Sequence, residues 1–177
     1  VLVGLGSADL VLVGARPGMG KTAFAMNIAV SAAKRTKKAV CVFSLEMSAE
    51  QLVTRLLSSE GMVDSYHLRS GELDEEEWSK IANAASAMAE TDILIDDTTG
   101  ITVSGMKAKL RRVKNLGLIV IDYLQLMQSE KKTDNRVNEV ADISRSLKLM
   151  AKEFGVPVIC CAQLSRGPEK RDDKRPQ

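Results

Sequence analysis

Short apolar runs alternate along the chain with longer segments of mixed polarity, and this alternation predicts the elements and their order. Five runs have the length of a buried strand and are bounded by Gly, Pro or charged residues. They cover residues 10–13, 39–43, 92–96, 118–122 and 156–162. Between them, apolar residues recur every three or four positions, the spacing of one helix face. Strands alternating with helices predict an α/β fold, with a mainly parallel sheet, right-handed crossovers and helices on both faces.

Local signals predict where the helices begin and end. Ser48 and Gln51 have the spacing of a capping box, and Gly61 is expected to end the helix that they begin. Residues 62–73 are expected to form a connector, and Thr102 to cap a later helix. The expected helices are 21–34, 48–61, 72–89, one after 102, and 136–154. The expected buried stripes are Trp78, Ile81 and Ala85 in the third helix, and Val137, Val140, Ile143, Leu147 and Ala151 in the last.

Composition narrows the class of protein. The chain has 177 residues, 45% of them hydrophobic and 27% charged, which fits one ordinary domain. No apolar run approaches the ~18 residues of a membrane span, and no secretory signal opens the chain, so we expect a cytoplasmic protein. The cysteines, Cys41, Cys160 and Cys161, lie in strand-like runs and are expected to be reduced core thiols. His67 is the one histidine, and its expected role is structural or at the surface.

The clearest chemical motif follows the first predicted strand. The segment Gly14-Ala15-Arg16-Pro17-Gly18-Met19-Gly20-Lys21-Thr22, followed by Ala23, joins a strand to a helix through a glycine-rich turn. This is the context of a P-loop, in which backbone N–H groups and a helix N-terminus hold phosphate. Lys21 is expected to reach the β- and γ-phosphates of ATP, and the Thr22 hydroxyl to bind Mg²⁺. Ala15 occupies the place of the pattern's first glycine, a small departure.

A second motif ends the fourth predicted strand. Asp122 follows four apolar residues, as in the Walker B pattern, whose carboxylate holds Mg²⁺ directly or through water. Tyr123 comes next, so no glutamate beside Asp122 is available to activate water. In a parallel sheet the strand ends share one rim, which also receives Glu46 and Gln163. We therefore expect Glu46 to be the catalytic base and Gln163 to sense the γ-phosphate.

Other charged residues have less specific interpretations. Asp96 and Asp97 are expected to form a turn. The basic residues between 107 and 114 are expected to be a solvated helix face, with nucleic acid or a subunit interface as the minority interpretation.

Four strings together resemble the successive motifs of bacterial DnaB-type replicative DNA helicases. They are 14–22, Phe43-Ser-Leu-Glu-Met-Ser48, Ile121-Asp-Tyr-Leu-Gln-Leu126 and Ala162-Gln-Leu-Ser-Arg166, in family order across nearly the whole chain. Asp142-Ile-Ser-Arg-Ser-Leu-Lys148 also resembles a family helix. The resemblance implies a RecA-like ATPase domain over 1–177, in a hexameric ring that moves 5′ to 3′ on single-stranded DNA and unwinds the fork. It implies the same roles for Lys21, Thr22, Glu46, Asp122 and Gln163 as above.

The resemblance also implies partners and missing parts. The loops after Leu126 and Leu164 match regions that line the ring's channel, with Arg166, Lys170 and Arg171 as candidate DNA contacts. Primase and a helicase loader are expected to bind through an amino-terminal domain and other regions outside this chain. The linker helix and the family's arginine finger are expected to lie outside it too, so this piece alone should hydrolyse ATP poorly. A RecA-like recombinase and an ATP-gated interaction module without turnover remain as alternatives.

Overall fold

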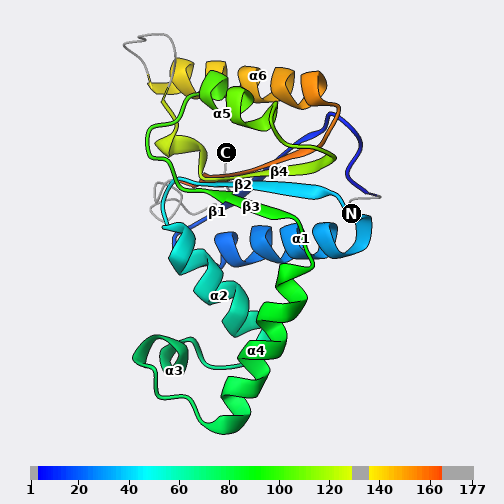
Figure 1. Cartoon of the computed structure of the whole chain (residues 1–177). Coiled ribbons are helices and arrows are strands. Elements are labelled where there is room, and N and C mark those ends of the chain that lie inside the picture. Colours follow the sequence, from blue (N-terminus) through cyan, green and yellow to red (C-terminus); the bar gives the residue numbers. More distant parts are fainter. Residues whose placement is uncertain (1–3, 129–135, 165–177) are drawn as a thin grey trace.

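The computed structural model describes residues 4–128 and 136–164, and it contains the predicted alternation of strands and helices (Figure 1). The elements are β1 (Leu10–Ala15), α1 (Lys21–Thr36), β2 (Ala39–Ser44), α2 (Ala49–Gly61), α3 (Ser65–Ser70), α4 (Glu75–Ala89), β3 (Ile93–Asp96), α5 (Val103–Leu110), β4 (Leu116–Asp122), the 3₁₀ turn η1 (Leu124–Leu126), α6 (Arg136–Phe154) and β5 (Val158–Gln163). Part of the predicted polar loop 125–135 is thus η1, and 129–135 lies outside the described residues.

The strands form one parallel sheet in the order β1-β5-β4-β2-β3. This confirms the predicted sheet but corrects one expectation about burial. We expected residues 10–13 to form a buried strand, yet β1 lies at an edge of the described sheet and Leu12 is 52% exposed. An apolar run alone does not distinguish a central strand from an edge strand, because each can hydrogen-bond to a neighbouring strand.

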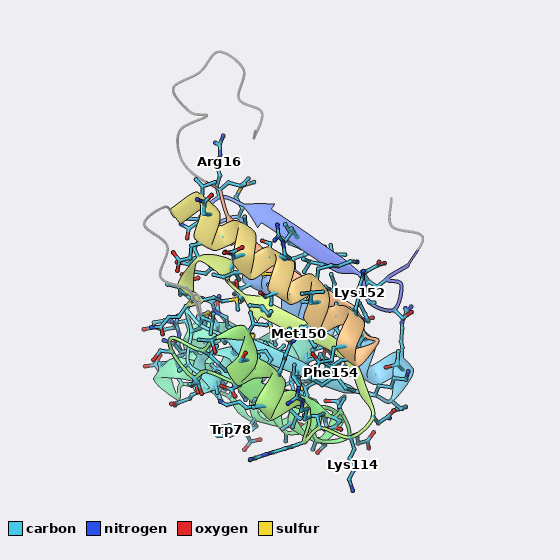
Figure 2. All side chains as sticks on the ribbon, turned by 90° about the horizontal axis from the view of Figure 1, so that it is seen from above. Arg16, Trp78, Lys114, Met150, Lys152 and Phe154 are labelled. Atoms are coloured by element: carbon cyan, nitrogen blue, oxygen red, sulfur yellow. The ribbon has the colours of Figure 1, made fainter. Side chains whose placement is uncertain are left out.

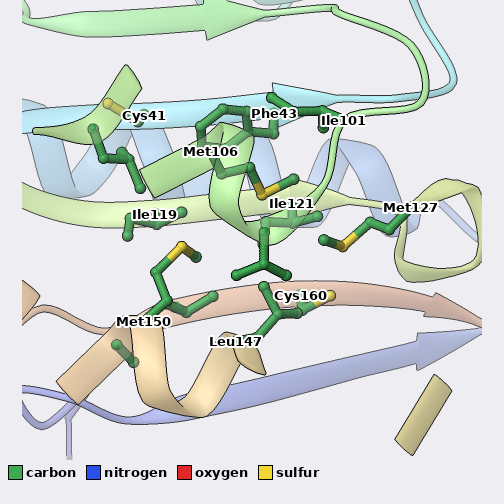
Figure 3. Packing of buried hydrophobic residues seen from close by; sticks show 14 of the residues in the cluster. Cys41, Phe43, Ile101, Met106, Ile119, Ile121, Met127, Leu147, Met150 and Cys160 are labelled. Carbon is green, nitrogen blue, oxygen red and sulfur yellow. The ribbon is translucent and has the colours of Figure 1, made fainter. Parts of the chain in front are cut away.

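Side chains alternate between the two faces of the sheet, and helices cover both. Cys41, Phe43, Ile119 and Ile121 point to the side of α5 and α6 and pack there with Met106, Leu147 and Met150 (Figure 3). Val40, Val42, Leu118 and Val120 point the other way, against α1 and α2. The helices α5 and α6 lie next to each other over their face, as Figures 1 and 2 both show. Two apolar layers therefore hold the central strands rigid, as expected for period-two alternation.

The helices α2, α3 and α4 form an arm that extends away from the sheet (Figure 1). Its first turn confirms the predicted capping box, because the Ser48 hydroxyl accepts from the Gln51 N–H while the Gln51 side chain accepts from the Ser48 N–H. The predicted C-cap is wrong, since Met62 rather than Gly61 takes the left-handed conformation with φ 52°. A Cβ on Gly61 would lie 3.2 Å from Ile81 Cδ1, so Gly61 allows α2 to pack closely against α4.

Two further expectations in the arm need correction. The connector 62–73 contains α3, which Asp64 caps at one end and Gly71 at the other. Trp78 and Ala85 are exposed, and the buried residues of α4 are Ile81 and Ala84. Trp78 lies at the periphery of the molecule and is 57% exposed (Figure 2). Because most of α4 extends beyond the sheet, its fully buried residues form only a narrow stripe (Figure 1).

The last helix follows its predicted stripe with one exception. Ile143, Leu147 and Ala151 are buried and Val140 is half-buried, whereas Val137 is 73% exposed. Gly155 ends the helix region with φ 64°, and β5 then brings Gln163 to the carboxyl edge of the sheet. Within residues 4–128 and 136–164, no helix combines the length and apolar character needed to cross a bilayer.

Candidate active site

The P-loop leaves the N-terminus of α1 open toward the rim of the sheet. Gly18 and Gly20 have φ values of 79° and 77°, a region that disfavours residues with a Cβ, so glycine is required at these turns. Gly20 is the N-cap of α1 and offers no side-chain cap, whereas α2 and α5 are capped by Ser48 and Thr102. The first N–H groups of α1 are therefore presented to a ligand, and the helix dipole favours an anion there.

Asp122 lies behind this turn and connects the two predicted motifs. The Thr22 hydroxyl donates to its Oδ2 at 2.5 Å, and Lys21 Nζ lies 3.7 Å from its Oδ1. The Lys21 ammonium also lies 4.3 Å from the centroid of the Tyr123 ring, a cation–π contact. Asp122 is 3% exposed, and its Oδ1 is buried without a hydrogen bond. An anionic oxygen in that condition is suited to a cation or an ordered water.

These donors fit Mg²⁺ in the way that nucleotide sites hold it. Mg²⁺ is commonly bound by one or two protein oxygens, with substrate phosphates and waters as its other ligands. Asp122 and Thr22 provide such a pair at the phosphate end of α1. No cluster of three or more His, Cys, Asp and Glu that could hold a metal by themselves occurs among residues 4–128 and 136–164.

Glu46 is held past the end of β2 by a tightly bonded turn. The Leu45 N–H donates to the Asp122 carbonyl at 2.7 Å, and the Ser44 hydroxyl donates to the Met47 carbonyl at 2.7 Å. Ser44 pairs in register with Asp122, so Glu46 emerges beside the Walker B strand. The Glu46 side chain is exposed and lines a pocket that Lys21 and Thr22 also line.

Most of the predicted site residues line one pocket of about 560 Å³, and Asp122 lies outside its lining. The lining includes Lys21, Thr22, Glu46 and Gln163, and from the turn also Arg16, Pro17, Gly18, Gly20 and Ala23. Gly14, Ala15 and Met19 are not in the lining, and Met19 is 71% exposed. Gly14 instead permits close packing, since a Cβ there would lie 3.2 Å from a Leu164 side-chain atom. Arg16 projects from this end of the molecule (Figure 2).

Sequence reasoning missed several residues at this site. Met47, just before α2, and Gln51 and Arg55, on α2, line the same pocket. Gln51 and Arg55 are four residues apart and so share a helix face. The capping box predicted the start of this helix, so the shared face could have been inferred from the sequence. The platform that Tyr123 offers Lys21 had no sequence signal.

The cysteines are free and buried, as the sequence indicates. Cys161 is on the α1 side of β5, and burial, then the nearby Asp122 carboxylate, raises the pKa of its thiol to about 12. Burial likewise raises the pKa of Cys41 to about 11 and that of Cys160 above its usual range. Thiols so disfavoured as thiolates are inert core groups.

Residues 96–114 contact each other, α2 and α6, in keeping with a structural role. Asp96 accepts from the Thr98 N–H, and Asp97 accepts from the Ala49 N–H. Lys107 and Arg111 both pair with Glu153 of α6, and Lys109 pairs with Asp96. The helix ends at Leu110, so Arg111, Arg112 and Lys114 follow it and do not extend its face. The candidate DNA contacts Arg166, Lys170 and Arg171 lie outside the described residues.

The fold and the site together define a RecA-like P-loop ATPase domain. They combine a parallel sheet, a P-loop after its first strand, a buried Walker B aspartate, and a glutamate at the end of the adjacent strand. Residues 1–177 match the family described as DnaB-like helicase C terminal domain, and the chain belongs to this family. That membership favours a helicase over a recombinase.

Known proteins resemble the chain in sequence and in structure. It is 54% identical over 172 residues to the replicative DNA helicase DnaC of Bacillus subtilis, and 52% identical over 177 residues to the replicative DNA helicase DnaB of Geobacillus stearothermophilus. These alignments cover 95% and 98% of the chain but 38% and 39% of the relatives.

Two solved structures have the same fold. One is a DnaB-like replicative helicase studied with its interactions with primase. Its TM-score is 0.89 at 35% identity, over 98% of this chain and 43% of that one. The other is described as an ATPase domain, and its TM-score is 0.90 at 35% identity, over 97% of this chain and 63% of that one.

Proposed function

We propose that this domain hydrolyses Mg·ATP and that the full-length gene product couples this reaction to movement along single-stranded DNA as a replicative helicase. The observation that supports this most strongly is the single pocket that Lys21, Thr22, Glu46 and Gln163 share, with Asp122 buried behind Thr22. These are the residue types that phosphoryl transfer to water requires.

In the proposed reaction each side chain has one task. The N–H groups of the P-loop and the Lys21 ammonium bind the β- and γ-phosphates. Thr22 and Asp122 hold Mg²⁺, which when bound neutralises charge on the phosphate oxygens. Glu46 accepts a proton from the attacking water, whose oxygen bonds to the γ-phosphorus as the bond to the bridging oxygen breaks, giving ADP and phosphate. Gln163 hydrogen-bonds the γ-phosphate and responds to its loss.

Tyr123 supports Lys21 in this scheme. The ring centroid lies 4.3 Å from the ammonium, and the Asp122 Oδ1 lies 3.7 Å from it. Held by the ring and the carboxylate together, Lys21 is kept near the phosphate cradle before nucleotide arrives.

The proposal extends to assembly and partners. We infer a homohexameric ring around single-stranded DNA, with residues after Leu126 and Leu164 facing the channel and a cation from a neighbouring subunit completing the site. Primase and a loader bind elsewhere in the polypeptide, and the protein acts in the cytoplasm. Relatives described as replicative helicases, and a neighbour described with its primase interactions, support this proposal.

Two assays of the full-length gene product test the function. ATP turnover should rise when single-stranded DNA is added, and a forked duplex should be separated when the single-stranded 5′ tail is available but not when only a 3′ tail is. Equal turnover with and without DNA, together with no strand separation on either substrate, would contradict the proposal.

A further inference from the structure

Gln125 makes a contact with the backbone of Gln163 that none of the roles above uses. Its side-chain Nε2 donates to the Gln163 carbonyl at 2.9 Å, and its Oε1 accepts from the Gln163 N–H at 3.1 Å. One primary amide thus binds both backbone groups of a single residue, as a neighbouring strand's peptide groups do in a sheet. We call this pair of bonds the amide clamp.

The sheet register explains why the clamp is needed. On the β1 side of β5, the Val158 N–H donates to the Asp9 carbonyl and the Leu164 N–H to the Ala15 carbonyl. The backbone N–H and C=O groups of even-numbered β5 residues therefore point to β1. The backbone groups of odd-numbered residues point to β4, as the bond from the Ile119 N–H to the Pro157 carbonyl shows. Pairing of β5 with β4 ends at Cys160, which leaves the inward-facing backbone groups of Gln163 beyond the end of β4. The amide clamp satisfies both.

The position of Gln125 is fixed by its neighbours. It lies in η1, the 3₁₀ turn that follows β4, between Leu124 at 3% and Met127 at 2% exposure. These two buried side chains anchor the turn in the core, so Gln125 is directed at β5 with little freedom. The contact joins the segment that leaves β4 to the segment that leaves β5.

We propose that Gln125 is a positioning residue, which holds Gln163 at the γ-phosphate and couples any shift of Gln163 to η1. The argument rests on the proposed function, in which Gln163 senses the γ-phosphate. Gln163 lines the nucleotide pocket while its backbone is held by Gln125. A shift of Gln163 on loss of phosphate therefore pulls on η1 directly, and a displacement of η1 moves Gln163. This is a physical route between two bonded elements.

The test compares three variants. Gln125→Met keeps the length of the side chain and removes both bonds, whereas Gln125→Glu keeps an acceptor for the N–H and loses the donor. Asn83→Met is the control, because it also replaces an exposed side-chain amide by Met, but on α4 and outside the nucleotide pocket. Thermal unfolding of each variant first establishes that the fold is retained.

Amide hydrogen exchange in the 177-residue chain measures the clamp itself. The Gln163 N–H donates to the Gln125 side chain, so its protection depends on that bond. Its exchange should be about tenfold faster in Gln125→Met, the scale of one net hydrogen bond, and unchanged in Asn83→Met. Unchanged exchange in Gln125→Met would overturn the clamp.

Turnover and binding in the full-length gene product measure the coupling. Both Gln125 variants should bind a non-hydrolysable ATP analogue no more tightly than ADP, with the affinity for ADP unchanged. Their DNA-stimulated kcat should be about tenfold lower than that of the wild type. Asn83→Met should behave as wild type. Wild-type preference and stimulation in Gln125→Met would refute the inference. A wild-type protein without DNA stimulation would instead refute the proposed function, and exchange and analogue preference would still decide the clamp.

Discussion

Asp122 is the residue that joins the two halves of the candidate site. It ends a strand whose side chains are buried on both faces, so its carboxylate is carried into the interior at 3% exposure. Thr22 and Lys21 approach it from the P-loop, 100 and 101 residues earlier in the chain. A buried carboxylate is costly unless it is compensated, so this position is built for a cation.

Lys21 is the side chain whose loss should affect binding most. Lys21→Ala removes a charge-assisted phosphate contact while keeping a good helix former at the first residue of α1. We expect calorimetry on the 177-residue chain to detect no ATP binding for this variant. Arg35→Ala, which removes an exposed cation from the same helix, should bind as wild type. Unchanged ATP affinity in Lys21→Ala would contradict the P-loop assignment.

At the scale of single elements, the local signals for where a helix begins were reliable, whereas the predicted C-cap at Gly61 was wrong. Ser48 with Gln51 predicted the start of α2, because a cap satisfies helix N–H groups whatever surrounds it. Asp74 with Glu77 forms a second capping box of the same kind. Predictions of burial were less reliable, as Trp78 shows. Periodicity placed Trp78 on an inner stripe of α4. The arm extends away from the sheet, however, and the sequence does not indicate which part of a helix has other elements packed against it.

The contact between α3 and α4 gives a pH-dependent prediction. His67 Nδ1 lies 2.8 Å from Glu77 Oε1, and this hydrogen bond with the Glu77 charge raises the pKa of His67 above its ordinary 6.5. A raised folded-state pKa means that the contact stabilises fully below 6.5 and is lost as pH rises through the folded-state value. An NMR titration should give a His67 midpoint above 6.5, lowered by Glu77→Gln and little changed by Glu72→Gln. A wild-type midpoint at or below 6.5 would contradict the contact.

At the scale of the whole molecule, the sequence was enough to place several strand ends on one rim. Parallel strands align their carboxyl ends, so Glu46, Asp122 and Gln163 had to meet near the P-loop once the alternation was read. The strand order could not be read in the same way, and β1 was wrongly expected to be buried. The amide clamp was also beyond sequence reasoning, because Gln125 and Gln163 are 38 residues apart and no periodicity relates them.

The central claim is that this rim hydrolyses ATP, and the role of Glu46 tests it most directly. Glu46 emerges at the pocket from a turn held by Ser44 and Leu45, without a described contact that makes it structural. Exchanging its carboxylate for an amide should therefore leave the fold and the phosphate cradle intact. Glu50→Gln is the matched control, since Glu50 is an exposed glutamate on α2 outside the nucleotide pocket.

The measurement is steady-state ATP turnover of the full-length gene product with single-stranded DNA present, alongside the affinity for Mg·ATP. For Glu46→Gln we predict near-normal affinity and turnover lower by ~10²-fold or more, the usual contribution of a positioned general base. Glu50→Gln should retain both. Turnover of Glu46→Gln within a few-fold of wild type would contradict the account and would mean that the base is another residue.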